Sequence, residues 1–474
     1  MISWKLILFT IYQVIVIITI IHVVMDNRQP AKTMAWALVI WFVPIVGIVF
    51  YLFFGINTRK ERLVSQRSMD QLSKRSMLEF VEQKDLSLPE DYKAIIELFV
   101  NENLSLPFKN NEVRFYTDGY AFFPALLREI AAAKDHIHID MYIIDDDPLG
   151  NLVADALIDK VREGVEVRLI YDDVGCWNVK HGFFERMREE GIEVVPFLPV
   201  RFPSFTSKVN YRNHRKLIVI DGRTGFIGGM NIALRYVKGT KTQPWRDTML
   251  QVTGSGVYSL QRAFLVDWYF VDRTQISDRK YYPKNIEIEP NSTLIQMVTS
   301  GPVTPYPEIM QGLVRVIIAA KRYLYIETPY FLPTEPVLFA LKTAALGGVD
   351  VRIMVPFRSD AKFVEWASRS YLREMVDTGV KVLYYQTGFL HSKMVVSDDA
   401  ICTCGSTNVD FRSFENNFEA NVFIYDEDVA VQMRDVFLAD EKQSVLFSDI
   451  PKRIRPSFMK RLGESVVRLL SPVM

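Results

Sequence analysis

The sequence predicts an α/β protein in which two pseudo-symmetric, layered α/β/α domains follow a two-helix transmembrane hairpin. Three observations predict it: two long apolar segments near the N-terminus, a helix-and-strand pattern that occurs twice, and a sparse polar motif that also occurs twice in the 474 residues. We expect the hairpin in residues 1–56, a cytoplasmic linker in 57–110, the two domains in 111–285 and 286–450, and a basic amphipathic helix in 451–474.

The N-terminal segment has the length and composition of a membrane hairpin. Residues 4–24 and 34–54 are each long enough to cross a hydrocarbon core of roughly 30 Å. Neither carries a charged side chain apart from Lys5 and, when protonated, His22. Two buried core helices are the alternative, which the length disfavours.

Basic residues predict the orientation of the hairpin. The loop between the two apolar segments holds Arg28 and Lys32, whereas the stretch after them is much more basic. The positive-inside rule therefore places the rest of the chain in the cytoplasm. The basic residues after the second segment are Arg59, Lys60, Arg62, Arg67, Lys74 and Arg75.

The overall composition excludes several classes of function. Lys plus Arg and Asp plus Glu are both 56, so no basic excess points to a nucleic-acid partner. The three cysteines, Cys176, Cys402 and Cys404, offer neither a disulfide framework nor a zinc site, and they fit a reducing compartment. We expect no metal and no cofactor.

Past the linker, the chain repeats itself. In each half, helical stretches that end in a turn alternate with short β-branched runs, which predicts an α/β layered domain. A pseudo-two-fold axis between two such domains would bring their equivalent edges face to face. The matching stretches, in the same order along both halves, are 131–139 and 318–326, 164–170 and 348–354, and 191–194 and 379–382.

A sparse polar motif lies at the same place in both halves. It reads His-x-Lys-x4-Asp-x6-Gly-[Gly/Ser]-x-Asn with identical spacing, and two of the six histidines of the chain belong to it. One position differs, because Gly229 stands where the second copy has Ser406, so the two half-sites are not equivalent. The copies comprise His214, Lys216, Asp221, Gly228, Gly229 and Asn231, and His391, Lys393, Asp398, Gly405, Ser406 and Asn408.

The motif supplies the groups that phosphodiester chemistry needs. Two histidines can divide nucleophilic attack and proton transfer between them, because imidazole titrates near neutral pH. Lys216 and Lys393 can neutralise the phosphate oxygens, while Asn231 and Asn408 donate from their amides. His and Lys two positions apart on a strand point to one face, and the motif glycines allow close backbone approach.

The C-terminal segment predicts a helix with one apolar side. After Pro451 the chain is basic, with Glu464 its only acid. Two interpretations stay open: the helix docks on the protein, or it lies on an anionic membrane surface, which the basic bias favours. The apolar positions at helical spacing are Phe458, Leu462, Val466, Leu469 and Leu470.

The doubled motif resembles that of the phospholipase D superfamily. Longer strings around it, at residues 211–216, 226–231, 327–333 and 389–393, are similar to bacterial cardiolipin synthases. The resemblance covers essentially the whole chain. It implies two phospholipase D-type domains in a multi-pass phosphatidyltransferase of the bacterial cytoplasmic membrane, with the catalytic domains on the cytoplasmic side.

The resemblance also implies a metal-independent transfer in two steps. One histidine attacks phosphatidylglycerol to form phosphatidyl-histidine, and the other protonates the departing glycerol. The second histidine then deprotonates a hydroxyl of another phosphatidylglycerol, which gives cardiolipin. Family precedent favours His214 as the nucleophile and His391 as the acid and base. The partners are these two lipids and the bilayer.

The same family implies which acids support the histidines. Asp221 and Asp398 are expected in the catalytic site mainly as support, and a purely structural role stays open for each. A separate acid is expected to orient each histidine, and the matching candidates are Asp247 and Glu419. Surface acids at the end of a strand are the alternative for this second pair.

Three rival functions remain at this stage. A membrane-bound phospholipase D that hydrolyses phospholipid to phosphatidic acid shares every motif residue and differs only in the acceptor. A nuclease of the same superfamily is disfavoured by the neutral charge balance and the hairpin. An inactive membrane-bound scaffold is disfavoured because both motifs are intact.

Overall fold

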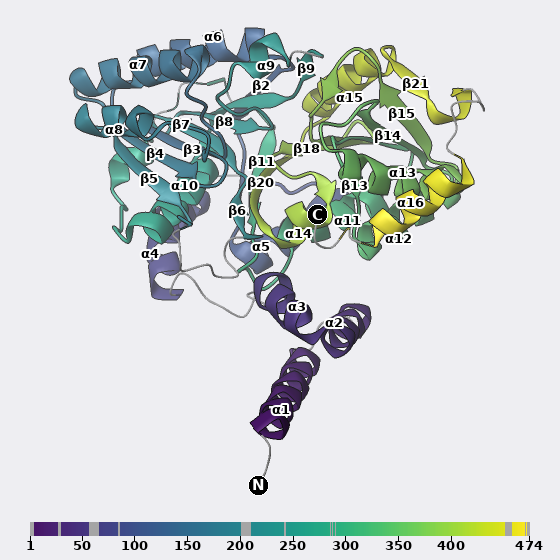
Figure 1. The fold of residues 1–474 in the computed structure, drawn as a ribbon. Coiled ribbons are helices and arrows are strands. Elements are labelled where there is room, and N and C mark those ends of the chain that lie inside the picture. Colours follow the sequence, from purple (N-terminus) through teal and green to yellow (C-terminus); the bar gives the residue numbers. More distant parts are fainter. Residues whose placement is uncertain are drawn as a thin grey trace. The chain divides into compact units, whose positions relative to one another are not determined.

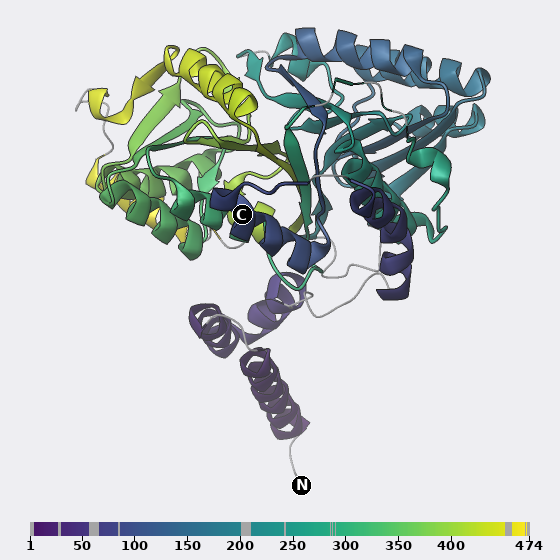
Figure 2. The same cartoon turned by 180° about the vertical axis from the view of Figure 1, so that it is seen from behind.

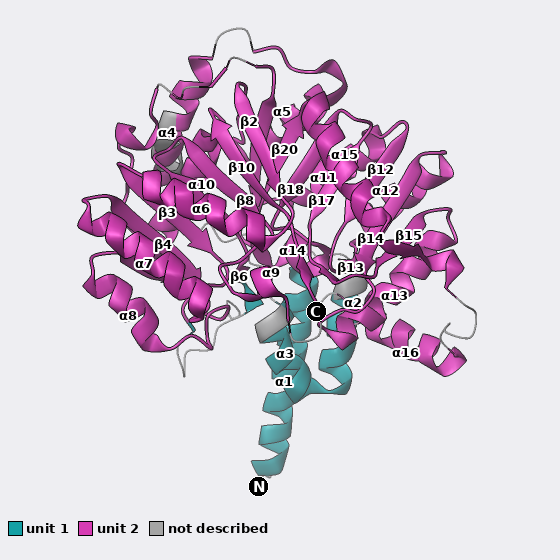
Figure 3. Cartoon of the chain, turned by 90° about the horizontal axis from the view of Figure 1, so that it is seen from above, with its two compact units in different colours: residues 1–61, 200–211 teal, residues 62–199, 212–474 magenta. Residues whose placement is uncertain are grey.

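The structure, a computed structural model, describes residues 4–26, 30–55, 66–83, 86–200, 210–240, 243–284, 286, 288, 289, 291–450, 457–469 and 471. The chain forms two compact units, shown in Figure 3. The first contains residues 1–61 and 200–211, and the second contains residues 62–199 and 212–474.

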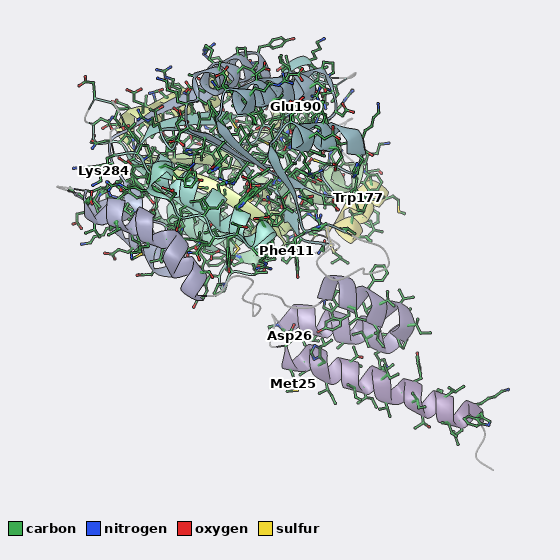
Figure 4. All side chains as sticks on the ribbon, turned by 90° about the vertical axis from the view of Figure 1, so that its left-hand side faces the viewer. Met25, Asp26, Trp177, Glu190, Lys284 and Phe411 are labelled. Carbon is green, nitrogen blue, oxygen red and sulfur yellow. The ribbon has the colours of Figure 1, made fainter. Side chains whose placement is uncertain are left out.

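One long apolar helix dominates the first unit. Helix α1 (Trp4–Met25) is the single helix among the described residues that is long and apolar enough to cross a membrane. Figure 4 labels Met25 and Asp26 where it ends. Its side chains are mostly exposed, and the buried pair Val16 and Val23 packs with Ile40 and Tyr51.

The second predicted span, residues 34–54, is not one helix, which corrects the expected hairpin of two continuous helices. The segment forms α2 (Pro30–Phe42), α3 (Pro44–Phe50) and a π-helical turn, η1 (Tyr51–Gly55). The break falls at Val43, whose φ of −134° and ψ of 64° are not helical. Pro44 causes it, because a proline lacks an N–H and disfavours helical geometry in the residue before it.

The first half of the second unit is a sheet of seven strands between helices (Figure 1). Helices α6 (Gly119–Ala132), α7 (Pro148–Arg162) and α8 (His181–Glu189) share an apolar core with one face of this sheet, and α10 (Val257–Asp272) covers the other. The strands, in spatial order, are β2 (Asn111–Tyr116), β10 (Met249–Gly254), β8 (Thr224–Gly228), β7 (Lys216–Ile220), β3 (His136–Met141), β4 (Glu166–Asp172) and β5 (Glu193–Phe197).

The second half has the same order of strands, which confirms the predicted repeat of two layered α/β domains. Helices α11 (Glu308–Ala319), α12 (Glu335–Leu346) and α13 (Lys362–Val376) share its core, and α15 (Glu427–Glu441) lies on the other face. The equivalent strands are β11 (Leu294–Ser300), β20 (Asn417–Tyr425), β18 (Ile401–Gly405), β17 (Met394–Ser397), β12 (Tyr323–Glu327), β14 (Asp350–Pro356) and β15 (Lys381–Tyr385).

Short elements complete the second unit. Strands β1 (Pro107–Phe108) and β21 (Ser444–Leu446) extend the second sheet at its two edges. The others are β6 (Arg212–Asn213), β9 (Trp245–Arg246), β13 (Phe331–Leu332), β16 (Phe389–Leu390), β19 (Val409–Asp410), α9 (Arg235–Lys238), α14 (Phe411–Glu415), η4 (Arg279–Tyr281) and η5 (Phe447–Asp449).

Much of the expected linker, residues 57–110, is part of the folded body instead. Residues 56–65, 84 and 85 lie outside the described residues, but α4 (Gln66–Val81) contacts α10, where Ser73 accepts a hydrogen bond from Arg262 at 2.9 Å. After the turn η2 (Glu90–Tyr92), α5 (Lys93–Asn103) buries Ile95, Ile96 and Phe99 in the core of the second half (Figure 2). Apolar residues at helical spacing explain why this polar stretch is folded.

The C-terminal helix, α16 (Phe458–Arg468), docks on α13. Its contacts come from one side: Val467 packs near Leu332 and Ala367, and Glu464 forms an ion pair with Arg373 at 2.5 Å. The predicted apolar positions that the structure describes, Phe458, Leu462, Val466 and Leu469, stay exposed. Residues 451–456, Leu470 and 472–474 lie outside the described residues.

The two motif aspartates lie away from the histidines. Asp221 follows β7 at the end opposite Lys216, and its carboxylate accepts hydrogen bonds from the amides of Lys134, Asp135 and His136 at 2.9–3.0 Å. Asp398 makes the equivalent bonds, at 2.6–2.9 Å, to the amides at the start of β12. This placement corrects the expectation that these two residues belong to the catalytic group.

We predict that Asp398→Ala lowers the free energy of unfolding by roughly 1–3 kcal/mol, because it leaves backbone N–H groups without acceptors. Asp398 has a left-handed φ of 57°, which asparagine tolerates better than alanine. Asp398→Asn should therefore lose less stability, since it keeps one acceptor oxygen. Denaturant unfolding of the two variants measures the difference, and equal losses would contradict the assignment.

Candidate active site

Two short parallel strand pairs join the halves of the second unit. Strand β6 of the first half pairs with the start of β20 of the second, and β9 of the first half pairs with β16 of the second. In each pair a motif histidine follows one strand and an acid follows the other. The amide of His214 donates to the carbonyl of Phe418 at 2.9 Å, and that of His391 donates to the carbonyl of Arg246 at 2.7 Å.

This register exchanges the orienting acids between the halves. Nδ1 of His214, in the first half, lies 3.0 Å from both carboxylate oxygens of Glu419, in the second. Nδ1 of His391, in the second half, lies 2.6 Å from Oδ2 of Asp247, in the first. A carboxylate at Nδ1 fixes the tautomer and leaves Nε2 free to react. Both candidate acids therefore contact a motif histidine, each across the interface.

The difference between Gly229 and Ser406 follows from these acids. Ser406 donates its hydroxyl to Glu419, which also accepts a hydrogen bond from the side chain of Asn417 at 3.2 Å. At the matching position in the first copy, a Cβ on Gly229 would come within 2.0 Å of the carboxylate of Asp247. Only glycine therefore leaves room for the acid there.

Both motif lysines are buried beside their own histidines. Nζ of Lys216 donates to the carbonyl of His214 at 2.6 Å, and Nζ of Lys393 donates to the carbonyl of His391 and lies 2.9 Å from its Nδ1. Burial, together with the positive charge of Lys393, lowers the pKa of Lys216 to about 7, against the opposing effect of Glu419. Burial also lowers the pKa of Lys393.

The histidines are neutral near neutral pH. Burial is the largest cause, and it lowers the pKa of His214 to about 4 and that of His391 to about 3, against the opposing effect of their carboxylates. The positive charges of Lys216 and Lys393 also lower the pKa of each histidine. A neutral imidazole has the free electron pair that a nucleophile or a general base needs.

Asn231 and the motif glycines Gly228 and Gly405 mainly hold the protein together. Asn231 accepts a hydrogen bond from the amide of Ile143 at 3.0 Å and donates to the hydroxyl of Tyr236 at 2.5 Å. Asn408 is buried near the second histidine–lysine pair, and it lines a small internal cavity together with Lys393. A Cβ on Gly228 or Gly405 would lie within 2.4 Å of a carbonyl oxygen on the adjacent strand, so these glycines permit strand packing.

The structure adds a buried charge cluster in the first half that the sequence reasoning missed. Asp140, at the end of β3, is completely buried and hydrogen-bonded to Asn213, next to His214. Arg215 forms an ion pair with Asp267 of α10 and donates to the carbonyl of Glu419 at 3.1 Å. Burial and the nearby Asp267 raise the pKa of Asp140 well above its usual range.

The second half has the matching cluster. Glu327, at the end of β12, is buried, and burial raises its pKa to about 8. Arg246 forms an ion pair with Asp440 of α15 at 2.7 Å and lies 3.7 Å from Glu327. In both clusters two carboxyl groups lie near one guanidinium, and burial raises the pKa of one of the two carboxyls.

A longer comparison of the two copies would have found these residues. Asp140 and Glu327 directly follow the matching stretches 131–139 and 318–326. Asp267 and Asp440 end the strings Phe-Leu-Val-Asp and Phe-Leu-Ala-Asp in α10 and α15. Acids at matching buried positions of a repeat indicate that both copies need a carboxyl group at that position.

Aromatic rings surround the two histidines unequally. The ring centres of Trp245, Phe389, Tyr236 and Tyr330 lie 5.2–6.4 Å from that of His391. Beside His214, the described contact is with Tyr142, whose ring centre is 4.9 Å away. Aromatic rings are therefore more numerous around His391, although the two side chains are almost equally buried, with 12% of His214 and 10% of His391 exposed.

Comparisons with known proteins agree with this architecture. Residues 126–251 and 313–440 match the family described as "Cardiolipin synthase, PLD-like domain", and residues 14–55 match "Phospholipase_D-nuclease N-terminal". A solved structure, the phosphatidylserine synthase of Haemophilus influenzae Rd KW20, aligns with a TM-score of 0.63 over 81% of this chain and 100% of that chain. At 16% identity this likeness shows a shared fold alone.

Curated relatives align over nearly their whole length. A cardiolipin synthase of Oceanobacillus iheyensis is 38% identical over 95% of this chain and 95% of its own. The major cardiolipin synthase ClsA of Bacillus subtilis (strain 168) is 37% identical over 97% of both chains. With both repeated domains and the N-terminal region matched, the chain belongs to the cardiolipin synthase family with phospholipase D-like domains.

Proposed function

We propose that this protein is a cardiolipin synthase that transfers a phosphatidyl group from one phosphatidylglycerol to another, with release of glycerol. The observation that carries the proposal is the single buried group formed by two histidines, two lysines and two exchanged acids. One phosphodiester carries one negative charge, which the two lysines can neutralise without a metal. The relatives named above support the choice of lipid substrates.

In the first step, Nε2 of His214 attacks the phosphorus of phosphatidylglycerol. The P–N bond forms, the bond from phosphorus to the glycerol oxygen breaks, and His391 gives that oxygen a proton. We assign the nucleophilic role to His214 because the resemblance to the family favours it. The charge of the bound phosphodiester raises the pKa of His391, which is low in the free protein, and so lets it carry this proton.

In the second step, His391 acts as the base. It removes a proton from a glycerol hydroxyl of the second phosphatidylglycerol, whose oxygen attacks the phosphorus and displaces His214. Cardiolipin is released, and His391 is protonated again by the proton taken from the acceptor hydroxyl. Glu419 and Asp247 hold Nδ1 of the two rings throughout, so that both Nε2 atoms face the phosphorus.

The location we propose is the bacterial cytoplasmic membrane, with the catalytic unit on its cytoplasmic side. Helix α1 supports membrane attachment. The basic residues that follow the second apolar segment in the sequence support the cytoplasmic side. We propose that the segment broken at Pro44 also enters the membrane, as a bent pair of helices.

The substrate assignment predicts that purified full-length protein, given phosphatidylglycerol alone, forms cardiolipin and glycerol in equal amounts. Mass spectrometry of the lipids and an enzymatic glycerol assay measure both products. A His214→Ala, His391→Ala double variant is the matched control. Phosphatidic acid without cardiolipin would identify the protein as a hydrolytic phospholipase D instead.

The two histidine roles predict different responses to the leaving group. A phosphodiester with a nitrophenol leaving group needs no proton donor, so His391→Ala should still release one burst of nitrophenol and become labelled at His214. His214→Ala should give no burst. With phosphatidylglycerol, either change should slow turnover by at least roughly 10²–10⁴-fold. A burst from His214→Ala and none from His391→Ala would reverse the assignment.

The lowered pKa values predict the pH dependence of kcat/KM for the nitrophenyl phosphodiester, which reports the free enzyme and needs no proton from His391. Lys216 is charged below its pKa of about 7, so kcat/KM should fall as the pH rises through about 7. His214 gains a proton below its pKa of about 4, so kcat/KM should also fall as the pH drops through about 4. In Lys216→Arg, whatever its rate, the alkaline fall should disappear because arginine stays charged; an unchanged fall would assign it to another group.

A further inference from the structure

The C-terminal helix leaves most of its large apolar side chains exposed and buries an acid against the protein. In α16, the exposed fractions are 77% for Phe458, 48% for Leu462 and 78% for Leu469. The inward side is held by the buried ion pair of Glu464 with Arg373 and by Val467. A helix on the surface of a water-soluble body normally has the reverse arrangement.

Helix α13 continues this surface. Phe363 is 66% exposed and its ring centre lies 6.3 Å from that of Trp366, which is also exposed. Trp366 reaches α16, because a Cβ on Gly463 would lie 4.0 Å from its indole. We call this surface the apolar face, and define it by Phe363, Trp366, Phe458, Met459, Leu462 and Leu469. A contiguous exposed apolar surface of this kind marks an interaction site.

The charges around the apolar face are positive. Lys362, Lys460 and Arg461 are exposed on the same two helices. The three acids of these helices are already paired, Glu464 with Arg373, Glu374 with Arg468 at 2.7 Å and Glu365 with Arg369 at 2.5 Å. Apolar side chains flanked by exposed cations match an anionic lipid bilayer, into whose boundary the apolar groups insert.

The apolar face is connected to the active site. Val467 of α16 and Ala367 of α13 form one small core with Leu332 of β13. Two residues before Leu332, Tyr330 contributes one of the rings around His391. Docking this face on a bilayer would hold the His391 half-site next to lipid headgroups.

We propose that the apolar face of α13 and α16 docks on the anionic surface of the membrane and presents the His391 half-site to its lipid substrate. The inference rests on the proposed function in that the substrate lies in a bilayer. It adds a second membrane contact, made by the catalytic unit itself.

A fluorescent label at position 462 tests the docking directly. The natural cysteines are buried, with 5% or less of each exposed, so a Leu462→Cys variant of the full-length protein can be labelled selectively. Leu152→Cys is the matched control, because Leu152 on α7 is 51% exposed and lies in the other half. Both proteins are placed in vesicles of phosphatidylglycerol and phosphatidylcholine that contain lipids with a nitroxide on the acyl chain.

We expect the nitroxide lipids to quench the label at position 462 and to leave the label at position 152 unchanged. Quenching at 462 should weaken in vesicles of phosphatidylcholine alone and in a Lys460→Glu, Arg461→Glu variant. Equal signals at the two positions would overturn the proposal. Disulfide crosslinking of the unlabelled Leu462→Cys variant between two copies, without quenching of the labelled one, would also overturn it and assign the apolar face to a dimer.

An activity ratio separates docking from catalysis. The rate with phosphatidylglycerol in vesicles, divided by the rate in detergent micelles, should fall by about tenfold in Leu462→Asp, since a charge opposes burial in lipid. It should keep its wild-type value in Leu152→Asp. Quenching without any cardiolipin would support the docking and refute the proposed function. Cardiolipin formation without quenching would support the proposed function and refute the docking.

Discussion

The exchange of two short strands between the halves is the constraint on which the site depends. Strand β6 lies against β20 and β9 lies against β16, so the backbone itself sets each histidine beside an acid from the other half. A half that folded alone would have a histidine without its acid. The pairing therefore explains why the two halves form one compact unit: each copy completes the chemistry of the other.

Burial then decides the charge of the histidines and lowers the pKa of both lysines in this site. In water a histidine–lysine pair would carry a charged lysine and a partly charged histidine, but here burial lowers the pKa of Lys216 to about 7 and leaves both histidines neutral. Removing a positive charge is the least costly response when no anion is present. An anionic phosphodiester reverses this balance, so binding the substrate itself supplies the electrostatic conditions for the reaction.

The sequence was sufficient for the layered fold and for the pairs of His and Lys, because both leave a periodic or repeated pattern. It was insufficient for geometry set by tertiary contacts. Asp221 and Asp398 share the motif spacing with the histidines, yet they lie at the far strand ends, where they hold backbone amides. Glu419 and Asp247 were identified, but their exchange between halves has no local signal. Pro44 can be read in the sequence. It interrupts the helix that the hydropathy of residues 34–54 predicts as continuous.

The two buried clusters show how the copies diverged while keeping one requirement. Each pair of acids, Asp140 with Asp267 and Glu327 with Asp440, needs one guanidinium, because two buried carboxyls cannot both be charged without a cation. In the first cluster Arg215 supplies the guanidinium. Arg215 lies between the histidine and the lysine of the first motif, where the second copy has a serine. The second cluster takes the guanidinium from Arg246, which precedes Asp247, where the equivalent residue is Phe418. Both positions flank the same crossed strand pairs, so either one brings an arginine to the acids. The fold therefore requires one arginine in each cluster and leaves open which strand provides that arginine.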